Sequence, residues 1–332
     1  MNTLQQELER IARLVDIYLQ PHMTKREPAR LWEAAYHLPK AGGKRLRPFL
    51  MINVCKALGG NEEDALPPAV AIELIQAFSL VHDDIIDRDD LRRGVPTVHK
   101  KWGIPTAIVA GDLLHIKAYD IVTKAAMKNE KVMLVLPDIL NEINEATIEI
   151  CEGQELDEEL EKNPQPTEEE YFDMISRKTA ALFKASTAIG ALVAGSSPEA
   201  VESMRSFGHI LGVSFQIIDD ILGLTADEKE LGKPVGSDIR EGKRTLLTIH
   251  ALTSGSPDEK RTILKALGNA KASPRDFSKA VRAVVSTGAL DYSTKKARAY
   301  VEEARKALLS LPESDERNLL DEALTFIVKR SY

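Results

Sequence analysis

Two short acidic clusters in the sequence have the spacing needed to bind divalent metal ions. The first, HDDIIDRDD at residues 82–90, follows a strongly apolar stretch at residues 69–81. On a helix Asp83 and Asp87 share one face, where two carboxylates repel each other unless a cation lies between them. Carboxylate oxygens suit Mg²⁺, which completes its coordination shell with water and substrate phosphate. The alternative is a solvated acidic helix end, but the preceding apolar helix places these carboxylates at the edge of a core.

The second acidic cluster, FQIIDDIL at residues 215–222, has the same design and places Asp219 and Asp220 at the end of an apolar helix. One such cluster is ambiguous. Two in one helical chain favour metal binding over two unrelated helix ends, because helices of a bundle can present acidic side chains toward each other. We therefore predict a site that holds several divalent ions.

Basic residues lie close to both acidic clusters and at one glycine turn, GGKRLRP at residues 42–48. Arginine binds phosphate through two parallel hydrogen bonds, and lysine supplies a point charge. A single cation is most often a solvated surface residue, but this placement predicts that metals and cations together surround a diphosphate. The cations are Lys44, Arg45, Arg47, Arg92, Arg93, Lys178, Lys233 and Lys243.

The elements that carry these residues are predicted to be helices. Apolar residues recur at three- and four-residue steps along most of the chain, and alternating strand patterns are absent. Residues 132–136 could form a short strand by composition, but the helical pattern that follows favours a helix hairpin. Thr167 and Glu170 have the spacing of a capping box, and Pro67-Pro68 is typical of a break between helices. Because no long polar linker is present, we expect one all-helical domain, residues 1–332, of about ten helices.

The overall composition describes a globular protein with an acidic surplus. The chain has 332 residues, of which 44 are basic and 51 acidic, and its net charge is −7. This balance disfavours a nucleic-acid binder, which needs a cationic surface, and on the same scale it disfavours an anionic substrate. We expect a cytoplasmic protein, because no signal peptide and no apolar run of about 18–20 residues, the length of a membrane span, is evident. Cys55 and Cys151 lack CxxC spacing and are expected to be reduced core thiols.

In order and spacing, the motifs resemble those of the trans-isoprenyl diphosphate synthases, or polyprenyl synthetases, and most of all the archaeal-type short-chain geranylgeranyl diphosphate synthases. The resemblance rests on GGKRLRP, on Asp83 and Asp87 followed by RRG at residues 92–94, on Lys178-Thr179, and on Gln216 to Asp220 followed by Lys233 and Lys243. It implies an all-α, isoprenoid-synthase-type helical bundle around a deep central cavity, and a homodimer.

The implied reaction is a Mg²⁺-dependent, head-to-tail condensation of isopentenyl diphosphate with allylic diphosphates of C5 to C15. Three Mg²⁺ ions hold the allylic diphosphate, two of them through Asp83 and Asp87 and the third through Asp219. Metals and cations stabilise the charge that develops on the leaving diphosphate, so that an allylic carbocation forms. The double bond of isopentenyl diphosphate attacks this cation, and a proton is then lost.

The resemblance also implies roles for individual residues. The implied catalytic residues are Asp83, Asp87, Lys178, Thr179, Gln216, Asp219 and Lys233. The site for isopentenyl diphosphate is matched by Lys44, Arg47, Gln76 and Arg93. The allylic diphosphate site is matched by Arg92, Lys178, Lys233 and Lys243, with Thr179 and Gln216 near the reacting carbons.

Two positions depart from the family pattern. Gly223 stands where the second acidic motif has its last carboxylate, which leaves open whether Asp220 or the later Asp227 contributes to metal binding. Gln76 replaces the histidine of many relatives, and both side chains can donate a hydrogen bond.

The length of the product should depend on side chains one turn or more before Asp83, which would form the floor of the cavity. Phe78 and Ser79 lie five and four residues before Asp83. An aromatic residue there, without an insertion in the acidic motif, resembles the geranylgeranyl (C20) synthases. Phe78 could instead be only a core residue, and farnesyl (C15) or geranylfarnesyl (C25) products are the alternatives.

Two other classes of protein are less favoured. A class I terpene cyclase would leave Lys44 and Arg47 without a role and would tend to have an aromatic-rich cavity, whereas aromatic residues make up 5% of this chain. A non-catalytic subunit of a heteromeric synthase usually lacks one acidic motif, and here Asp83, Asp87 and every basic position are present.

Overall fold

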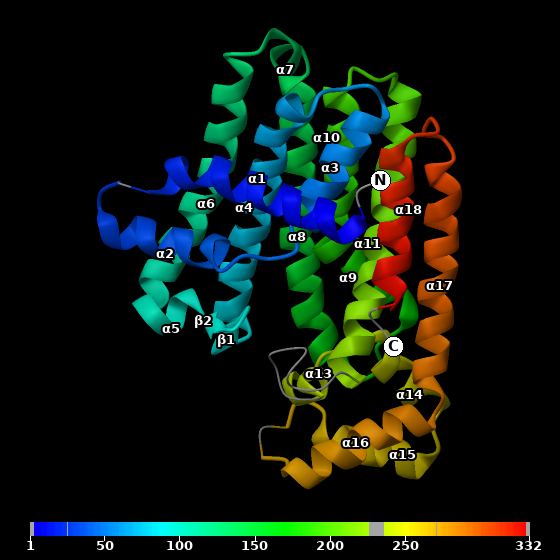
Figure 1. Ribbon diagram of the computed structural model, residues 1–332. Coiled ribbons are helices and arrows are strands. Elements are labelled where there is room, and N and C mark those ends of the chain that lie inside the picture. Colours follow the sequence, from blue (N-terminus) through cyan, green and yellow to red (C-terminus); the bar gives the residue numbers. More distant parts are fainter. Residues whose placement is uncertain (1–2, 25, 226–235, 270, 330–332) are drawn as a thin grey trace. The chain divides into compact units, whose positions relative to one another are not determined.

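The computed structural model describes residues 3–24, 26–225, 236–269 and 271–329, with the side chains of Ser237 and Lys329 excepted. Helices make up most of the described chain, as predicted (Figure 1). They are α1 (Leu4–Met23), α2 (Ala29–Lys40), α3 (Leu46–Ala57), α4 (Glu62–Ile86), α5 (Val98–Trp102), α6 (Ile104–Ala126), α7 (Glu130–Leu134), α8 (Leu136–Lys162), α9 (Glu168–Ile175), the π-helix η1 (Ser176–Ala180), α10 (Ala181–Val193), α11 (Pro198–Thr225), α13 (Ser237–Glu241), α14 (Leu246–Ser254), α15 (Pro257–Ala266), α16 (Pro274–Ser286), α17 (Ala289–Leu308) and α18 (Asp315–Lys329).

A short hairpin follows α4. Strands β1 (Leu91–Arg92) and β2 (Val95–Pro96) pair antiparallel, with Leu91 opposite Pro96. No strands were expected from the sequence, and this expectation was wrong here. Two-residue strands are too short to produce an alternating pattern. The hairpin matters for the site, since it carries Arg92 back toward the end of α4.

The contacts divide the chain into two compact units, each described separately. The first consists of Met1–Thr147, Leu182–Gly208 and Lys306–Ala323. In it α4 packs along α6 and against α3, and α2 and α5 also pack on α6 (Figure 1). Every residue of α4 from 65 to 75 is buried, which explains why this helix is apolar on all sides. Pro67-Pro68 lies inside α4, so the expected break there was wrong; the fixed proline φ near −65° suits a helix.

The second unit consists of Ile148–Ala181, His209–Arg305 and Leu324–Tyr332. In it α15 packs against α16, α14 contacts both, and α9 contacts η1 and α14. The capping box of Thr167 and Glu170 opens α9 as predicted, because each side chain satisfies a backbone N–H of the other residue. In the first unit, residues 132–134 end α7 and residue 136 begins α8, which confirms helix rather than strand in this segment. The single domain and the central cavity stay predictions.

Two helices, α4 and α11, are long and apolar enough to cross a membrane by length and composition, which the sequence analysis overlooked. Their apolar windows are 67% and 78% buried, a property that core helices share. Cys55 is buried as expected, but Cys151 is exposed. Ile150 and Gly153 are buried on α8. Cys151 follows Ile150 and is therefore rotated about 100° away from it around the helix axis, which explains its exposure.

Candidate functional site

The first acidic cluster ends α4. Asp87 is the C-cap residue, and its N–H donates to the carbonyl of Asp83 at 2.8 Å. This helical bond places the two residues one turn apart, as the sequence predicted. Both side chains are partly buried, which follows from the apolar helix that precedes them. Two oxygen donors at this spacing on a partly desolvated helix end fit a hard divalent cation.

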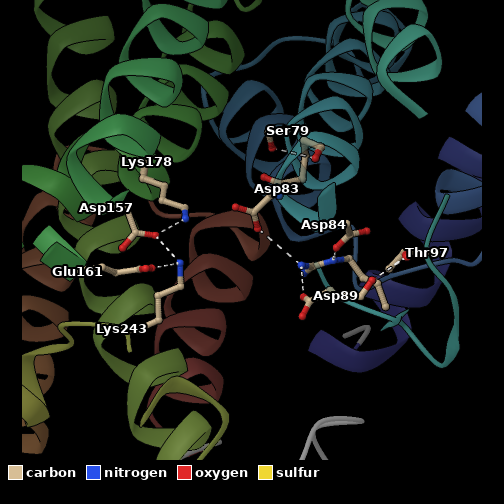
Figure 2. Close-up of polar contacts among 11 residues, drawn as sticks. Ser79, Asp83, Asp84, Asp89, Thr97, Asp157, Glu161, Lys178 and Lys243 are labelled. Carbon is tan, nitrogen blue, oxygen red and sulfur yellow. Dashed lines mark hydrogen bonds and ion pairs between the residues drawn. The ribbon is translucent and has the colours of Figure 1, made fainter. Parts of the chain in front are cut away.

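Arg92 lies among three carboxylates of the same cluster, which are labelled in Figure 2. Its Nε donates to Oδ1 of Asp84, and its Nη2 lies 3.2 Å from Oδ2 of Asp89 and 3.6 Å from Oδ2 of Asp83. Burial raises the pKa of Asp84 to about 6, although Arg92 opposes the rise. The Asp84 carboxylate therefore anchors Arg92, a role that the sequence analysis did not assign. Thr97 Oγ1 supports the same loop by donating to the carbonyl of Asp89 at 2.8 Å.

The cations matched to isopentenyl diphosphate belong to the glycine turn and the hairpin. Arg93 Nη1 donates to the carbonyl of Gly42, so the structure brings Arg93 to the turn that carries Lys44. A Cβ on Gly43 would lie 3.0 Å from the Arg93 guanidinium carbon, so a larger residue there would displace the end of the Arg93 side chain. Arg47 lies in the first turn of α3, and its guanidinium lies 4.2 Å from the centre of the Phe183 ring.

The side chains predicted to limit product length lie on α4 before Asp83. Phe78 is buried, and its ring stacks on His115 of α6 with centroids 5.0 Å apart. The hydroxyl of Ser79 donates to the carbonyl of Gln76 at 3.0 Å, and the Gln76 side chain is half-buried on the same helix. His115 was missed by the sequence analysis because nothing in the local pattern pairs α6 with Phe78.

In the second unit two predicted cations converge on one carboxylate. Lys178 Nζ and Lys243 Nζ lie 2.6 Å and 3.0 Å from Oδ2 of Asp157, and Lys243 also contacts Glu161 at 2.7 Å (Figure 2). Burial alone would raise the pKa of Asp157, but the two lysines outweigh it and the pKa lies below its usual value. Lys178 lies in the π-helix η1, an irregularity that is frequent at functional sites.

The second acidic motif contains two different aspartates. Asp219 is exposed, whereas Asp220 is buried and accepts hydrogen bonds from Tyr171 Oη and Gln216 Nε2, both at 2.7 Å. Gln216 in turn accepts from Thr179 Oγ1 at 2.7 Å, so two predicted site residues are directly bonded. Burial raises the pKa of Asp220 well above its usual value. Asp220 therefore fixes the motif from inside, whereas the side chain of Asp219 lies at the surface.

Gly223, which stands where the second motif has its last carboxylate, lies beside an aspartate that the sequence did not predict. A Cβ on Gly223 would lie 2.5 Å from Oδ2 of Asp238 on α13. The Asp238 carboxylate thus occupies the space beside position 223 that a larger residue would need. Lys233 and Asp227 lie outside the described residues.

The comparisons with known proteins agree with this fold and chemistry. A polyprenyl synthetase family model matches residues 28–284. The geranylgeranyl diphosphate synthase of Sulfolobus acidocaldarius is 49% identical over 281 residues, which are 84% of each chain. The solved geranylgeranyl pyrophosphate synthetase of Pyrococcus horikoshii is 43% identical, with a TM-score of 0.90 over 98% of each chain. A solved geranylgeranyl pyrophosphate synthase of Corynebacterium glutamicum, complexed with isoprenyl diphosphate and magnesium, is 29% identical, with a TM-score of 0.85 over 99% of each chain.

The helices and the paired acidic and basic clusters define an all-α protein with the isoprenoid synthase fold. The chain belongs to the polyprenyl synthetase family. It is a trans-prenyltransferase of the short-chain type.

Proposed function

We propose that the enzyme condenses isopentenyl diphosphate with allylic diphosphates of C5 to C15 in a Mg²⁺-dependent, head-to-tail reaction whose final product is geranylgeranyl diphosphate. The observation that carries this proposal is the end of α4, where Asp83 and Asp87 lie one turn apart beside the anchored Arg92. The similarity to relatives named geranylgeranyl diphosphate synthase supports the C20 product.

These carboxylates fit magnesium, because they are hard oxygen donors that leave coordination positions for phosphate. Asp83 and Asp87 would hold two ions, and Asp219 would hold a third. The chemistry that bound Mg²⁺ would supply is electrostatic stabilisation of the negative charge that develops on the diphosphate as its C–O bond breaks. The magnesium found in the related Corynebacterium structure supports this choice of metal.

The remaining site residues bind and orient the two substrates. Lys44, Arg47, Gln76 and Arg93 bind isopentenyl diphosphate, and Arg92, Lys178, Lys243 and Lys233 bind the allylic diphosphate. Asp157 holds the ammonium groups of Lys178 and Lys243 together, which positions their N–H donors for diphosphate oxygens. The hydrogen bond between Thr179 and Gln216 fixes two polar groups beside the reacting carbons.

The enzyme is proposed to act as a cytoplasmic homodimer in which residues 1–332 form one functional domain, without a nucleic-acid partner. Exposed apolar side chains along α6, namely Ile104, Ile108, Val109 and Ile116, support a self-association surface. The family match, which runs from residue 28 to residue 284, supports a single functional domain. Light scattering of the purified chain tests the dimer.

Product analysis with labelled isopentenyl diphosphate and C5, C10 or C15 allylic starters tests the activity. We expect Mg²⁺-dependent incorporation of label into an all-trans C20 diphosphate from each starter. A C15 or C25 end product would overturn the chain length. Cyclised hydrocarbon from an allylic diphosphate alone, or no incorporation of label, would overturn the reaction in favour of a cyclase or a non-catalytic subunit.

A further inference from the structure

A buried carboxylate in the middle of α4 joins two arginines that approach from different loops. Glu73 Oε1 lies 2.5 Å from Arg45 Nη1 and 3.8 Å from Arg93 Nη2. The Glu73 residue is 4% exposed, and the Arg45 side chain is completely buried. A charge buried this deeply is costly unless it is paired, so the contact defines where both guanidinium groups lie.

Both arginines have a strained backbone conformation. Within the described residues three non-glycine residues have positive φ, and two of them are Arg45 (φ 46°) and Arg93 (φ 53°). Such a conformation is unfavourable for a residue with a side chain and persists only where the surroundings enforce it. Arg45 is the N-cap residue of α3, immediately after Lys44, and Arg93 follows β1 in the hairpin. The side chains of both arginines contact the same carboxylate oxygen of Glu73.

The two arginines are bound with different strength. Arg45 also donates to Asp16 Oδ1 at 2.8 Å and to the carbonyl of Pro39 at 2.6 Å, so its guanidinium is held by three acceptors. The Arg93 guanidinium contacts Glu73 at a longer distance, and its Nη1 donates to the carbonyl of Gly42 and, at 3.5 Å, to the carbonyl of Leu38. Burial lowers the pKa of Arg93, and the Glu73 charge opposes this change. A guanidinium has five N–H donors, so one oriented in this way keeps donors for a diphosphate.

We propose that Glu73, fixed by Arg45, is a positioning residue that sets the Arg93 guanidinium for isopentenyl diphosphate and so determines the affinity for this substrate. This inference rests on the proposed function, in which Arg93 binds that diphosphate. Glu73 acts through Arg93 and touches neither substrate nor metal. Its loss should therefore affect one substrate and spare the other.

Steady-state kinetics of Glu73→Gln test the proposal, because this change keeps the size of the side chain and removes its charge. We expect the KM for isopentenyl diphosphate to rise about tenfold or more, the loss typical of one charge-assisted contact. The KM for geranyl diphosphate and kcat should stay within about twofold. Asp16→Asn is the matched control: it removes a half-exposed carboxylate from Arg45, which keeps Glu73, and should leave the KM for isopentenyl diphosphate within about twofold.

A double-mutant cycle separates positioning from a general structural role. In an Arg93→Ala background, Glu73→Gln should cause no further rise in the KM for isopentenyl diphosphate, because the group through which it acts is gone. Independent, additive effects would overturn the proposal, and so would an equal rise in the KM for both substrates. If Glu73→Gln does not fold, Glu73→Asp takes its place, since it keeps the charge but withdraws it from Arg93. A wild-type enzyme that incorporates no isopentenyl diphosphate would overturn the proposed function itself, whereas an active wild type with an unchanged KM in the Glu73 variant would overturn only this inference.

Discussion

Asp83, Asp84 and Asp87 lie within five residues of chain, but they occupy different electrostatic positions. Asp84 is buried against Arg92, whereas Asp83 and Asp87 present oxygens from successive turns. Because the proposed Mg²⁺ ions need both ligands, Asp83→Ala should lower kcat by about a hundredfold or more at saturating Mg²⁺. A magnesium titration of turnover measures this. Asp90→Ala, at an exposed residue paired with Lys100, is the control and should retain activity. Unchanged turnover in Asp83→Ala would refute the metal assignment.

Phe78 controls product length if its ring closes the cavity. The ring is buried one turn and a residue before Asp83 and stacks on His115, so Phe78→Ala removes most of its volume from that position. We expect the longest product to extend from C20 to C25 or beyond, measured by chromatography of the dephosphorylated products. Phe207→Ala, at a fully buried phenylalanine of α11, controls for loss of core packing and should keep the C20 product. An unchanged product in Phe78→Ala would show that Phe78 is only a core residue.

The sequence predicted those site residues whose relation is local. The helical period places Asp83 and Asp87 on one face, and the structure agrees. Asp157 and Glu73 were not predicted, because their partners lie 20 or more residues away along the chain. The residue type does not show whether a carboxylate is buried or solvated, because only tertiary contacts determine this.

At the scale of elements, the helical period predicted the all-α class and most helices, because burial of one helix face is recorded in the sequence. It failed where structure depends on a few residues, as in the two-residue strands after α4. The π-helix η1 has no periodic signal either, since it adds a residue to a single turn. Both irregular elements carry cations of the proposed site, Arg92 and Lys178.

The close contact between α8 and η1 depends on Gly153. A Cβ at this position would lie 2.2 Å from the backbone nitrogen of Lys178, and backbone atoms cannot yield as a flexible side chain can. Gly153→Ala should therefore separate the two helices, withdraw Asp157 from Lys178, and lower the free energy of unfolding by about 1–3 kcal/mol. The KM for the allylic diphosphate should rise about tenfold.

Thermal unfolding and steady-state kinetics check the Gly153 variant together. Glu155→Ala, at an exposed residue of the same helix, is the control and should change neither quantity. An unstable Gly153→Ala protein with an unchanged KM for the allylic diphosphate would separate the helix contact from the placement of Lys178.

On the scale of the whole molecule, a net charge of −7 opposes the binding of two anionic substrates. The cations of the proposed site do not by themselves offset this charge. Arg92 is surrounded by carboxylates, and Lys178 and Lys243 share one carboxylate. These cations are largely neutralised by their own partners. Bound metal is therefore needed to make the acidic clusters attractive to diphosphate, since an ion often carries the largest charge in such a site.

Inorganic pyrophosphate should consequently stabilise the protein only together with Mg²⁺. At a hundred times its dissociation constant, a ligand adds about 2.7 kcal/mol to the free energy of unfolding. A large domain gains about 2–4 °C in Tm per kcal/mol, so we expect a rise of about 5 °C or more. Differential scanning fluorimetry with pyrophosphate in the presence of Mg²⁺ or of EDTA measures the difference, and Asp83→Ala should reduce the rise. An equal rise with EDTA would mean that the protein's own cations suffice to bind diphosphate, and that the acidic clusters do not act through metal.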